Sequence, residues 1–472
     1  MRYSSDRAFR RQFEFLKRQF LQEGELPFAD VLSRDTAQQA LDSIEFAWNE
    51  RIYTPLVTLW IFLGQVISAD HSCRAAVARF IAHRISRGES ACSSQTGAYC
   101  QARKRLPEKF FAHVARGVGA ALDTKAELDW LWKNRKVFMF DGTTISMPDT
   151  PSNQQDYPQS NKQTPGVGFP LARVGAIFSL SCGAILDLAV AAYSGKGQGE
   201  VTLFRQLWDL FRPGDVVLTD ALMCNWQNLY SLQQRRVDMV TRLNKALRKA
   251  DFRRGKRLGK NDHLVQWGKP SMRDIDRETY RSFPDFITVR ECRFYVDQPG
   301  FRSTEVIIVT TILDPRDASV AELAELYGMW WNIETDFSSL KVTLQMDVLR
   351  CKTPELVRKE IWTHVLAYNL IRTIMAQTCC RAGMLPREIS FKATVQTLEA
   401  FQPFIASPSY RSLTDRLVLY EQIMDAIAVH QVGNRPGRIE PRLRKRRFKK
   451  YDFMMKPREE AKLDMLKRLK KK

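Results

Sequence analysis

Two acidic residues, Asp141 and Asp220, stand where the sequence predicts the ends of buried strands. Asp141 closes the apolar run 136–141, and Asp220 closes the run 215–220. Side chains at strand ends of an α/β sheet converge on ligands, although Asp at such a position is also a common turn former. A third acid beside this pair would complete a carboxylate cluster, whose repulsion a divalent cation offsets. The two acids therefore predict either two turns or part of a metal site.

The stretch 327–341, YGMWWNIETDFSSLK, predicts a helix that supplies the third acid, Glu334. Residues three or four apart share a helical face. Five residues have this spacing: Tyr327, Trp330, Glu334, Ser338 and Lys341. Trp331 and Phe337 lie beside that face and are expected to anchor the helix on a sheet. An amphipathic surface helix with solvated Glu334 and Lys341 has the same spacing, so spacing alone leaves both interpretations open.

Other residues with metal-binding or catalytic side chains fit such a site less well. Asp336 lies about 200° around the helix from Glu334 and is expected to face away. Glu200 precedes an amphipathic helix and is expected to interact with its N-terminal dipole, and Asp187 lies inside a predicted strand. The six His are dispersed singly, which favours neither a zinc site nor a His general base. Nine Cys without a CxxC pair indicate reduced thiols and a cytoplasmic location.

The charge of the chain predicts a polyanionic partner. Its 472 residues include 73 Lys and Arg against 52 Asp and Glu, a net charge of +21. Nucleic acid is the favoured partner and an anionic membrane the weaker alternative. Residues 435–472 alone hold seventeen Lys or Arg and five Asp or Glu, so this tail is a separate basic segment.

No signal peptide is expected, because residues 1–20 are charged throughout. No membrane partner is expected either, because the longest apolar run, 56–69, suits a buried helix.

The elements that would position these acids alternate between helices and strands. Residues 1–130 show helical periodicity. Strands are then expected at 136–141, ending in a turn at Asp141-Gly142, and at four further ranges: 173–180, 183–193, 215–220 and 237–243. The basic, Gly-containing region 247–262 interrupts this α/β pattern and precedes strands at 285–296 and 303–313. A capping box, Ser319 to Glu322, opens the helix that contains Glu334.

The spacing of Tyr327, Glu334 and Lys341 resembles the Tyr-Arg-Glu-Lys signature of cut-and-paste insertion-sequence transposases of the Asp-Asp-Glu type. Trp330 stands where that family has Arg. It is expected either to pack in the core beside Trp331 or to stack on an unpaired base at a distorted DNA end. Further segments resemble the family in the same order: 95–107, 141–153, 214–226, 349–372 and 441–458.

The resemblance implies an α/β fold with a ribonuclease-H-like catalytic core. In this division a helical DNA-end-binding region covers 1–130, and the core covers 131–240 and 319–380. A β-rich insertion covers 241–318, and a helical basic C-terminal region for DNA contact or dimerisation covers 381–472. Asp141, Asp220 and Glu334 would bind two Mg²⁺ ions about 4 Å apart, for which Mn²⁺ can substitute. Asp141 would bridge both ions.

DNA contacts are expected from the helical N-terminal region, the insertion and the tail. Arg103, Lys104 and Arg105 are expected to read element ends, or else to form a solvated loop. Tyr327 and Lys341 would contact phosphates beside the metal site. The insertion contributes a basic ribbon: Arg248, Lys249, Arg253, Arg254, Lys256, Arg257 and Lys260. Residues Arg444 to Lys450 of the tail are expected to contact DNA or a second protomer.

The implied function is a bacterial, cytoplasmic and nucleoid-associated transposase. It would cut the terminal inverted repeats of a mobile element as an endonuclease and join them to target DNA, as a homodimer assembled on double-stranded DNA. Because Trp330 replaces the signature Arg, the alternative is a catalytically impaired DNA-binding relative that regulates transposition. A metal-dependent nuclease that cuts without joining is a third interpretation.

Overall fold

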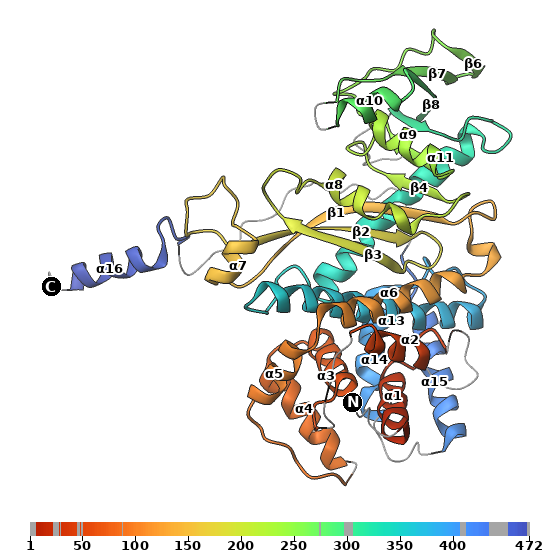
Figure 1. Cartoon of the computed structure of the whole chain (residues 1–472). Helices are drawn as coiled ribbons and strands as arrows, with labels where there is room; N and C mark the ends of the chain where they lie inside the picture. Colours follow the sequence, from red (N-terminus) through yellow and green to blue (C-terminus); the bar gives the residue numbers. More distant parts are fainter. Residues whose placement is uncertain are drawn as a thin grey trace. The chain divides into compact units, whose positions relative to one another are not determined.

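The computed structural model of the chain (Figure 1) describes residues 6–21, 28, 30–44, 48, 51–86, 88–272, 275–296, 305–405, 412–433 and 452–469. The chain divides into two compact units. The first consists of Met1–Phe138, Ala176–Leu188 and Trp331–Val432. The second consists of Met139–Gly175, Ala189–Trp330 and Gly433–Lys472. In the described ranges, no helix is both long and apolar enough to cross a bilayer.

The first unit is built mainly of helices, among which α13 (Pro354–Ala382) is the longest that the structure describes. Proline suits the first turn of α13, where its missing N–H leaves no bond unmade, and Gly383 ends the helix at φ 65°. Helix α13 packs against α3 (Pro55–Ile67), α6 (Glu108–Thr124) and α15 (Leu413–Ala428). The unit also holds α1 (Asp6–Gln19), α2 (Arg34–Asp42), α4 (Cys73–Ser86), α5 (Gly97–Arg105) and α14 (Phe391–Ile405). The helices predicted for 1–130 are confirmed.

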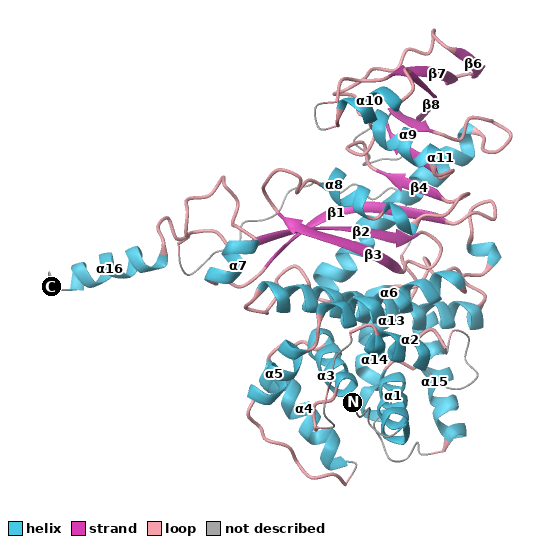
Figure 2. Cartoon of the chain, viewed as in Figure 1, coloured by secondary structure: helices cyan, strands magenta, loops and turns pink. Residues whose placement is uncertain are grey.

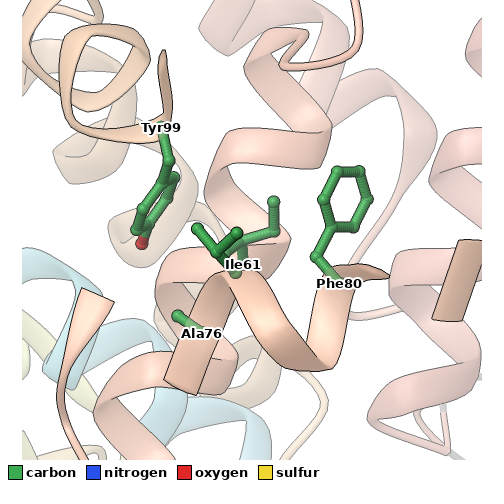
Figure 3. Close-up of a cluster of buried hydrophobic side chains, with 5 residues drawn as sticks. Ile61, Ala76, Phe80 and Tyr99 are labelled. Carbon is green, nitrogen blue, oxygen red and sulfur yellow. The ribbon is translucent and has the colours of Figure 1, made fainter. Parts of the chain in front are cut away.

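Helices α3, α4 and α5 share a small apolar core, drawn in Figure 3. Its buried members are Ile61, Ala76, Val77, Phe80 and Tyr99. The run 56–69 is therefore a buried helix, as its apolar composition predicts. This core holds the segment that carries Arg103, Lys104 and Arg105.

The strands in Figure 2 form a nine-stranded sheet with the order β3-β2-β1-β4-β5-β9-β8-β7-β6. Their bounds are β1 (Val137–Ser146), β2 (Leu171–Ser179), β3 (Ile185–Ala192), β4 (Val216–Thr219), β5 (Asp238–Arg242), β6 (Lys256–Gly259), β7 (Asp262–Gly268), β8 (Phe286–Tyr295) and β9 (Glu305–Thr310). Strands β4 and β5 are parallel, whereas β5, β9, β8, β7 and β6 pair antiparallel in that order. The boundary between the units falls inside β1, β2 and β3.

Apart from α12 (Asn332–Ser338) of the first unit, the remaining helices belong to the second unit. They are α7 (Pro151–Asp156), α8 (Glu200–Gln206), α9 (Trp226–Gln234), α10 (Arg277–Ser282), α11 (Val320–Gly328) and α16 (Arg458–Leu469). Ser319 and Glu322 form the predicted capping box at the start of α11. The fully buried Arg290 of β8 donates two hydrogen bonds of 2.8 Å to Asp262 of β7 and a third of 2.7 Å to the Ala318 carbonyl. This buried pair ties the insertion strands to the start of α11.

Three sequence-based expectations about these elements are wrong. Strand β1 does not end at Asp141-Gly142 but continues to Ser146. A Cβ on Gly142 would lie 2.5 Å from Cγ of Glu200, so this glycine permits a close approach rather than a turn. The basic region 247–262 contains β6 and the start of β7, whose exposed charged residues suit an edge strand.

The third error concerns the single helix expected after Ser319. The chain instead forms α11, a 3₁₀ turn (Met329–Trp331), α12 (Asn332–Ser338) and a π-helical turn (Ser339–Thr343). Because 3₁₀ and π turns have different residues per turn, the spacing from 327 to 341 does not define one regular helical face. Each residue of that stretch must be placed by its own contacts.

Candidate active site

Asp141 lies in the middle of β1, and β4 is a neighbour of β1 in the sheet. Its Oδ1 accepts a hydrogen bond of 2.7 Å from the Gly142 N–H. The apolar residues before Asp141 are buried and the polar residues after it are half-buried. Asp141 therefore marks the position where β1 passes from the core toward solvent.

Asp220 follows the last residue of β4, as predicted. Its carboxylate accepts a hydrogen bond of 3.0 Å from the Leu222 N–H, and its carbonyl accepts one of 2.7 Å from the Thr241 hydroxyl. Burial raises the pKa of the Asp220 carboxyl, although the backbone bonds act to lower it. A nearby cation would favour the charged form of such a carboxylate.

Tyr327 of α11 shares an electrostatic environment with both acids. Burial raises the pKa of its phenol above the usual value of 10.0. The guanidinium of Arg242 acts to lower this pKa, whereas Asp220 and Asp141 act to raise it. The second unit thus brings together Asp141, Asp220 and Tyr327, three residues that sequence reasoning had selected.

Arg242, the last residue of β5, belongs to this group and was not selected from the sequence. The strand 237–243 was predicted, but its terminal Arg was not considered. Since β4 and β5 are parallel neighbours, the residue that ends β5 lies at the same sheet edge as Asp220. Arg242 could have been found from the sequence by examining the polar residue that ends each predicted parallel strand.

Trp330 stacks on Tyr327, with ring centroids 6.3 Å apart and planes 4° apart. Trp331 is 40% exposed, so it does not anchor the helix as predicted. Phe337 does so, because its ring lies 5.0 Å from that of Phe178 in β2. The aromatic residues of 327–341 therefore differ in role, and only Phe337 matches its prediction.

Glu334 and Lys341 belong to the first unit, unlike the two Asp residues. Glu334 is exposed on α12, and Lys341 is half-buried in the π-helical turn. Asp336 is fully buried and forms ion pairs with Arg372 and Arg387. Asp336 thus points away from the exposed face of α12 that carries Glu334, as predicted.

In the described part of the chain, no three His, Cys, Asp or Glu side chains are already gathered as a metal site. The metal triad of Asp141, Asp220 and Glu334 therefore stays a prediction. Asp141 and Asp220 fit one part of it, since hard carboxylate oxygens are the ligands that Mg²⁺ prefers. The raised pKa of the Asp220 carboxyl also fits a group that a cation would hold in its charged form.

Two acids that might be mistaken for ligands have other partners. Glu200 lies in the first turn of α8, as predicted, and 3.8 Å from Arg173. Asp187 accepts a hydrogen bond of 2.7 Å from Arg116. Both residues are therefore explained by local structure.

Arg103 lies in the core of the first unit and is only 5% exposed. Its guanidinium lies 4.7 Å from the rings of both Phe62 and Tyr99 and donates to the sulfur of Cys73 at 3.2 Å. This burial leaves no surface for a DNA contact and corrects the expectation for Arg103. Its neighbours in the sequence, Lys104 and Arg105, are exposed.

The basic residues of the insertion are mostly exposed. The exposed ones are Lys249, Arg253, Arg254, Lys256, Arg257 and Lys260. Arg253 and Arg254 both pair with Asp251, and Arg248 lies over the ring of Trp267 at 4.5 Å. The prediction for residues 444–450 of the tail lies outside the described residues. The insertion thus presents a surface that suits a polyanion.

Comparison with known proteins identifies the family. Residues 132–370 match the family model described as "Transposase DDE domain". The chain is 27% identical over 299 residues to the transposase InsG of insertion sequence element IS4 from Escherichia coli, covering 62% of this chain and 64% of that protein. A 69-residue segment is 36% identical to the transposase of element IS421 from Escherichia coli, covering 15% of this chain and 19% of that one.

Among solved structures, a piggyBac transposase in a synaptic complex with hairpin DNA aligns with a TM-score of 0.41 and 8% identity. That alignment covers 88% of this chain and 85% of the other. The chain spans 64% of the length of the IS4 transposase, which is less than two thirds. The family assignment rests on the match over 132–370, which includes the predicted metal ligands Asp141, Asp220 and Glu334: the chain belongs to the DDE-type insertion-sequence transposases.

Proposed function

We propose that this protein cleaves the ends of its own insertion sequence and joins them to target DNA. The observation that carries the proposal is the placement of Asp141, Asp220 and Tyr327 in one electrostatic environment beside the strand end of β4. Two carboxylates and a phenol so placed suit a divalent cation and a phosphate. The catalytic core would be ribonuclease-H-like, built on β1 to β5, with β6 to β9 as its insertion.

Each predicted residue has a proposed role. Asp141 would bridge two Mg²⁺ or Mn²⁺ ions, Asp220 would complete one ion's site, and Glu334 the other. Divalent ions, which the family generally uses, activate the attacking water or 3′-hydroxyl and stabilise the leaving oxygen. Tyr327 and Lys341 would hold phosphates of the reacting strand. The exposure of Glu334 on α12 suits a residue that meets its ion when DNA binds.

DNA would bind outside this site through exposed cations. Lys104 and Arg105, at the end of α5, would contact the element end. Arg253, Arg254, Lys256 and Arg257 would contact phosphates without reading bases, so affinity should fall steeply with salt. The working form would be a homodimer assembled on DNA, because two ends must be cut together.

The test is cleavage of a 5′-labelled duplex, made from the DNA that borders the coding sequence, in the presence of Mg²⁺. Wild type should cut it, and Asp220→Asn should be at least about 10³-fold slower because a metal ligand is lost. Asp209→Asn is the matched control, since that exposed acid of the same unit should cut like wild type. Capture of the cut ends in a plasmid separates a transposase from a simple nuclease.

A second function, regulation of transposition without catalysis, is favoured by Trp330 in place of the signature Arg. If wild type and Asp220→Asn were equally inert while both still shifted the labelled duplex, catalysis would be wrong. The regulator would then be the better interpretation.

A further inference from the structure

The structure offers a replacement for the guanidinium that the family signature places at position 330. Trp330 stacks flat against Tyr327, and an indole cannot donate the paired hydrogen bonds with which Arg grips a phosphate. Such a replacement must lie near Tyr327 and the two Asp residues.

The register of β4 and β5 places Arg242 at this position. These parallel strands pair from Val216 with Asp238 to Thr219 with Thr241. One step further, Asp220 follows Thr219 and Arg242 follows Thr241, so the two residues leave the sheet side by side. Thr241 fixes this arrangement by donating its hydroxyl to the Asp220 carbonyl at 2.7 Å.

The backbone of Arg242 is held by its pairing with β9. Strand β5 lies between β4 and β9, where Arg242 pairs with Ile308. The Arg242 side chain is half-buried, and its two sequence neighbours are buried. A cation on a fixed backbone at a sheet edge is well placed for oriented phosphate binding.

The charges around Tyr327 place the guanidinium in the same cluster. Among the charged groups that act on the Tyr327 phenol, Arg242 has the largest effect, followed by Asp220. The interaction between charges weakens with distance, so this order agrees with the strand register, which brings Arg242 beside Asp220. Arg242 therefore lies near the residues that would bind the metal ions and the reacting strand.

We infer that Arg242 is a phosphate-binding residue of the cleavage site and supplies the guanidinium that Trp330 lacks. The ligand is a phosphodiester of the DNA strand held beside Asp220 and Tyr327, gripped by two N–H donors of the guanidinium. This inference rests on the proposed function. It also explains how a chain with Trp330 keeps a complete set of phosphate contacts.

The experiment compares Arg242→Gln and Arg242→Lys with wild type in single-turnover cleavage of the labelled border duplex. We expect the cleavage rate to fall about 100-fold for Arg242→Gln, as for other lost charge-stabilising donors. Arg242→Lys should fall about 10-fold, because a lysine keeps the charge but not the fork. Arg235→Gln, a cation of the same unit before β5, is the control and should cut at the wild-type rate.

A second-site variant separates a phosphate contact from a purely structural role. Trp330→Arg in the Arg242→Gln background restores a guanidinium at the signature position and should raise the cleavage rate at least about 10-fold. Affinity for the duplex should stay within about threefold of wild type in every variant, since one of many phosphate contacts is changed.

Two results would overturn the inference. The first is a cleavage rate of Arg242→Gln within about threefold of the wild-type rate. The second is a double variant, with Arg242→Gln and Trp330→Arg, that cleaves no faster than Arg242→Gln alone. Both are read against an active wild type. An inert wild type would instead count against the proposed function. The two failures are therefore distinguishable in one series of reactions.

Discussion

Asp336 in the first unit is a fully buried carboxylate, Asp220 in the second is half-buried, and their surroundings differ. Nη1 of Arg387 lies 2.8 Å from each carboxylate oxygen of Asp336 and donates to both. Asp336 also forms an ion pair with Arg372. Arg387 also donates to the carbonyls of Ser179 and Leu180 at 2.9 Å. A fully paired carboxylate of this kind stabilises one arrangement of the chain.

Asp220 has weaker compensation for its burial. It accepts backbone N–H bonds from Leu222 and Met223, and its pKa is nevertheless raised by burial. The difference separates a carboxylate that holds the fold from one that a bound cation would have to satisfy. The same residue type therefore indicates opposite roles, and its partners decide which.

The largest effect is expected when the paired carboxylate is removed. Asp336→Asn leaves the buried Arg372 and the half-buried Arg387 without their counter-charge, which should cost about 3 to 5 kcal/mol of unfolding free energy. Urea unfolding followed by circular dichroism measures this loss. Asp425→Asn, which removes an exposed partner of Arg381, should cost less than about 1 kcal/mol. Equal losses from the two variants would contradict the contrast.

Periodicity and composition predicted much of this fold because the signals are local. The helices of 1–130, the strands ending at 180, 193, 220 and 243, and the Ser319 capping box follow from local pattern and are present. Asp336 was correctly expected to face away from Glu334. The choice of Asp141 and Asp220 as metal ligands stays a prediction.

The errors arise from contacts between residues far apart in the sequence. Gly142 looked like a turn, but it accommodates Glu200 within a continuing strand. Arg103 looked like a surface cation, but Phe62 and Tyr99 enclose it. Arg242 was missed because its importance depends on the register of β5 with β4. Such pairings have no local sequence signal.

His364 provides a second comparison with the paired Asp336, because its neighbour His71 disfavours its charged form instead of compensating it. It is fully buried in α13, its ring centroid lies 6.4 Å from that of His71, and burial lowers its pKa to about 3. The unfolded chain, with a His pKa near 6.5, binds the proton more readily. The stability that the neutral His364 contributes is therefore fully present above pH 6.5 and is lost as the pH falls toward 3.

Between pH 7 and pH 5 this group should lower the unfolding free energy by about 2 kcal/mol. Urea titrations at both pH values measure the loss. His364→Leu should reduce the difference between the two pH values. A pH dependence identical in His364→Leu and wild type would show that another group is responsible.

A smaller effect is expected at the hydrogen bond that joins the ends of β4 and β5. Thr241→Val removes the donor to the Asp220 carbonyl and should cost about 1 kcal/mol in urea unfolding. Thr241→Ser retains the hydroxyl and serves as the matched control. If the two variants lost equal stability, packing of the Thr241 methyl group rather than the hydrogen bond would account for the cost.

The smallest expected effect on stability is that of Asp220→Asn. Unlike the other substitutions, it should stabilise the metal-free protein. Because burial raises the pKa of its carboxyl, the stability that the group contributes is fully present below the unfolded pKa and is lost as pH rises through the folded pKa. At pH 7 without metal, Asp220→Asn should therefore raise the Tm, by up to about 2 °C. Added Mg²⁺ should raise the Tm of wild type and leave that of the variant nearly unchanged, since a ligand is missing. A lower Tm for metal-free Asp220→Asn would place Asp220 with Asp336, among the carboxylates that hold the fold.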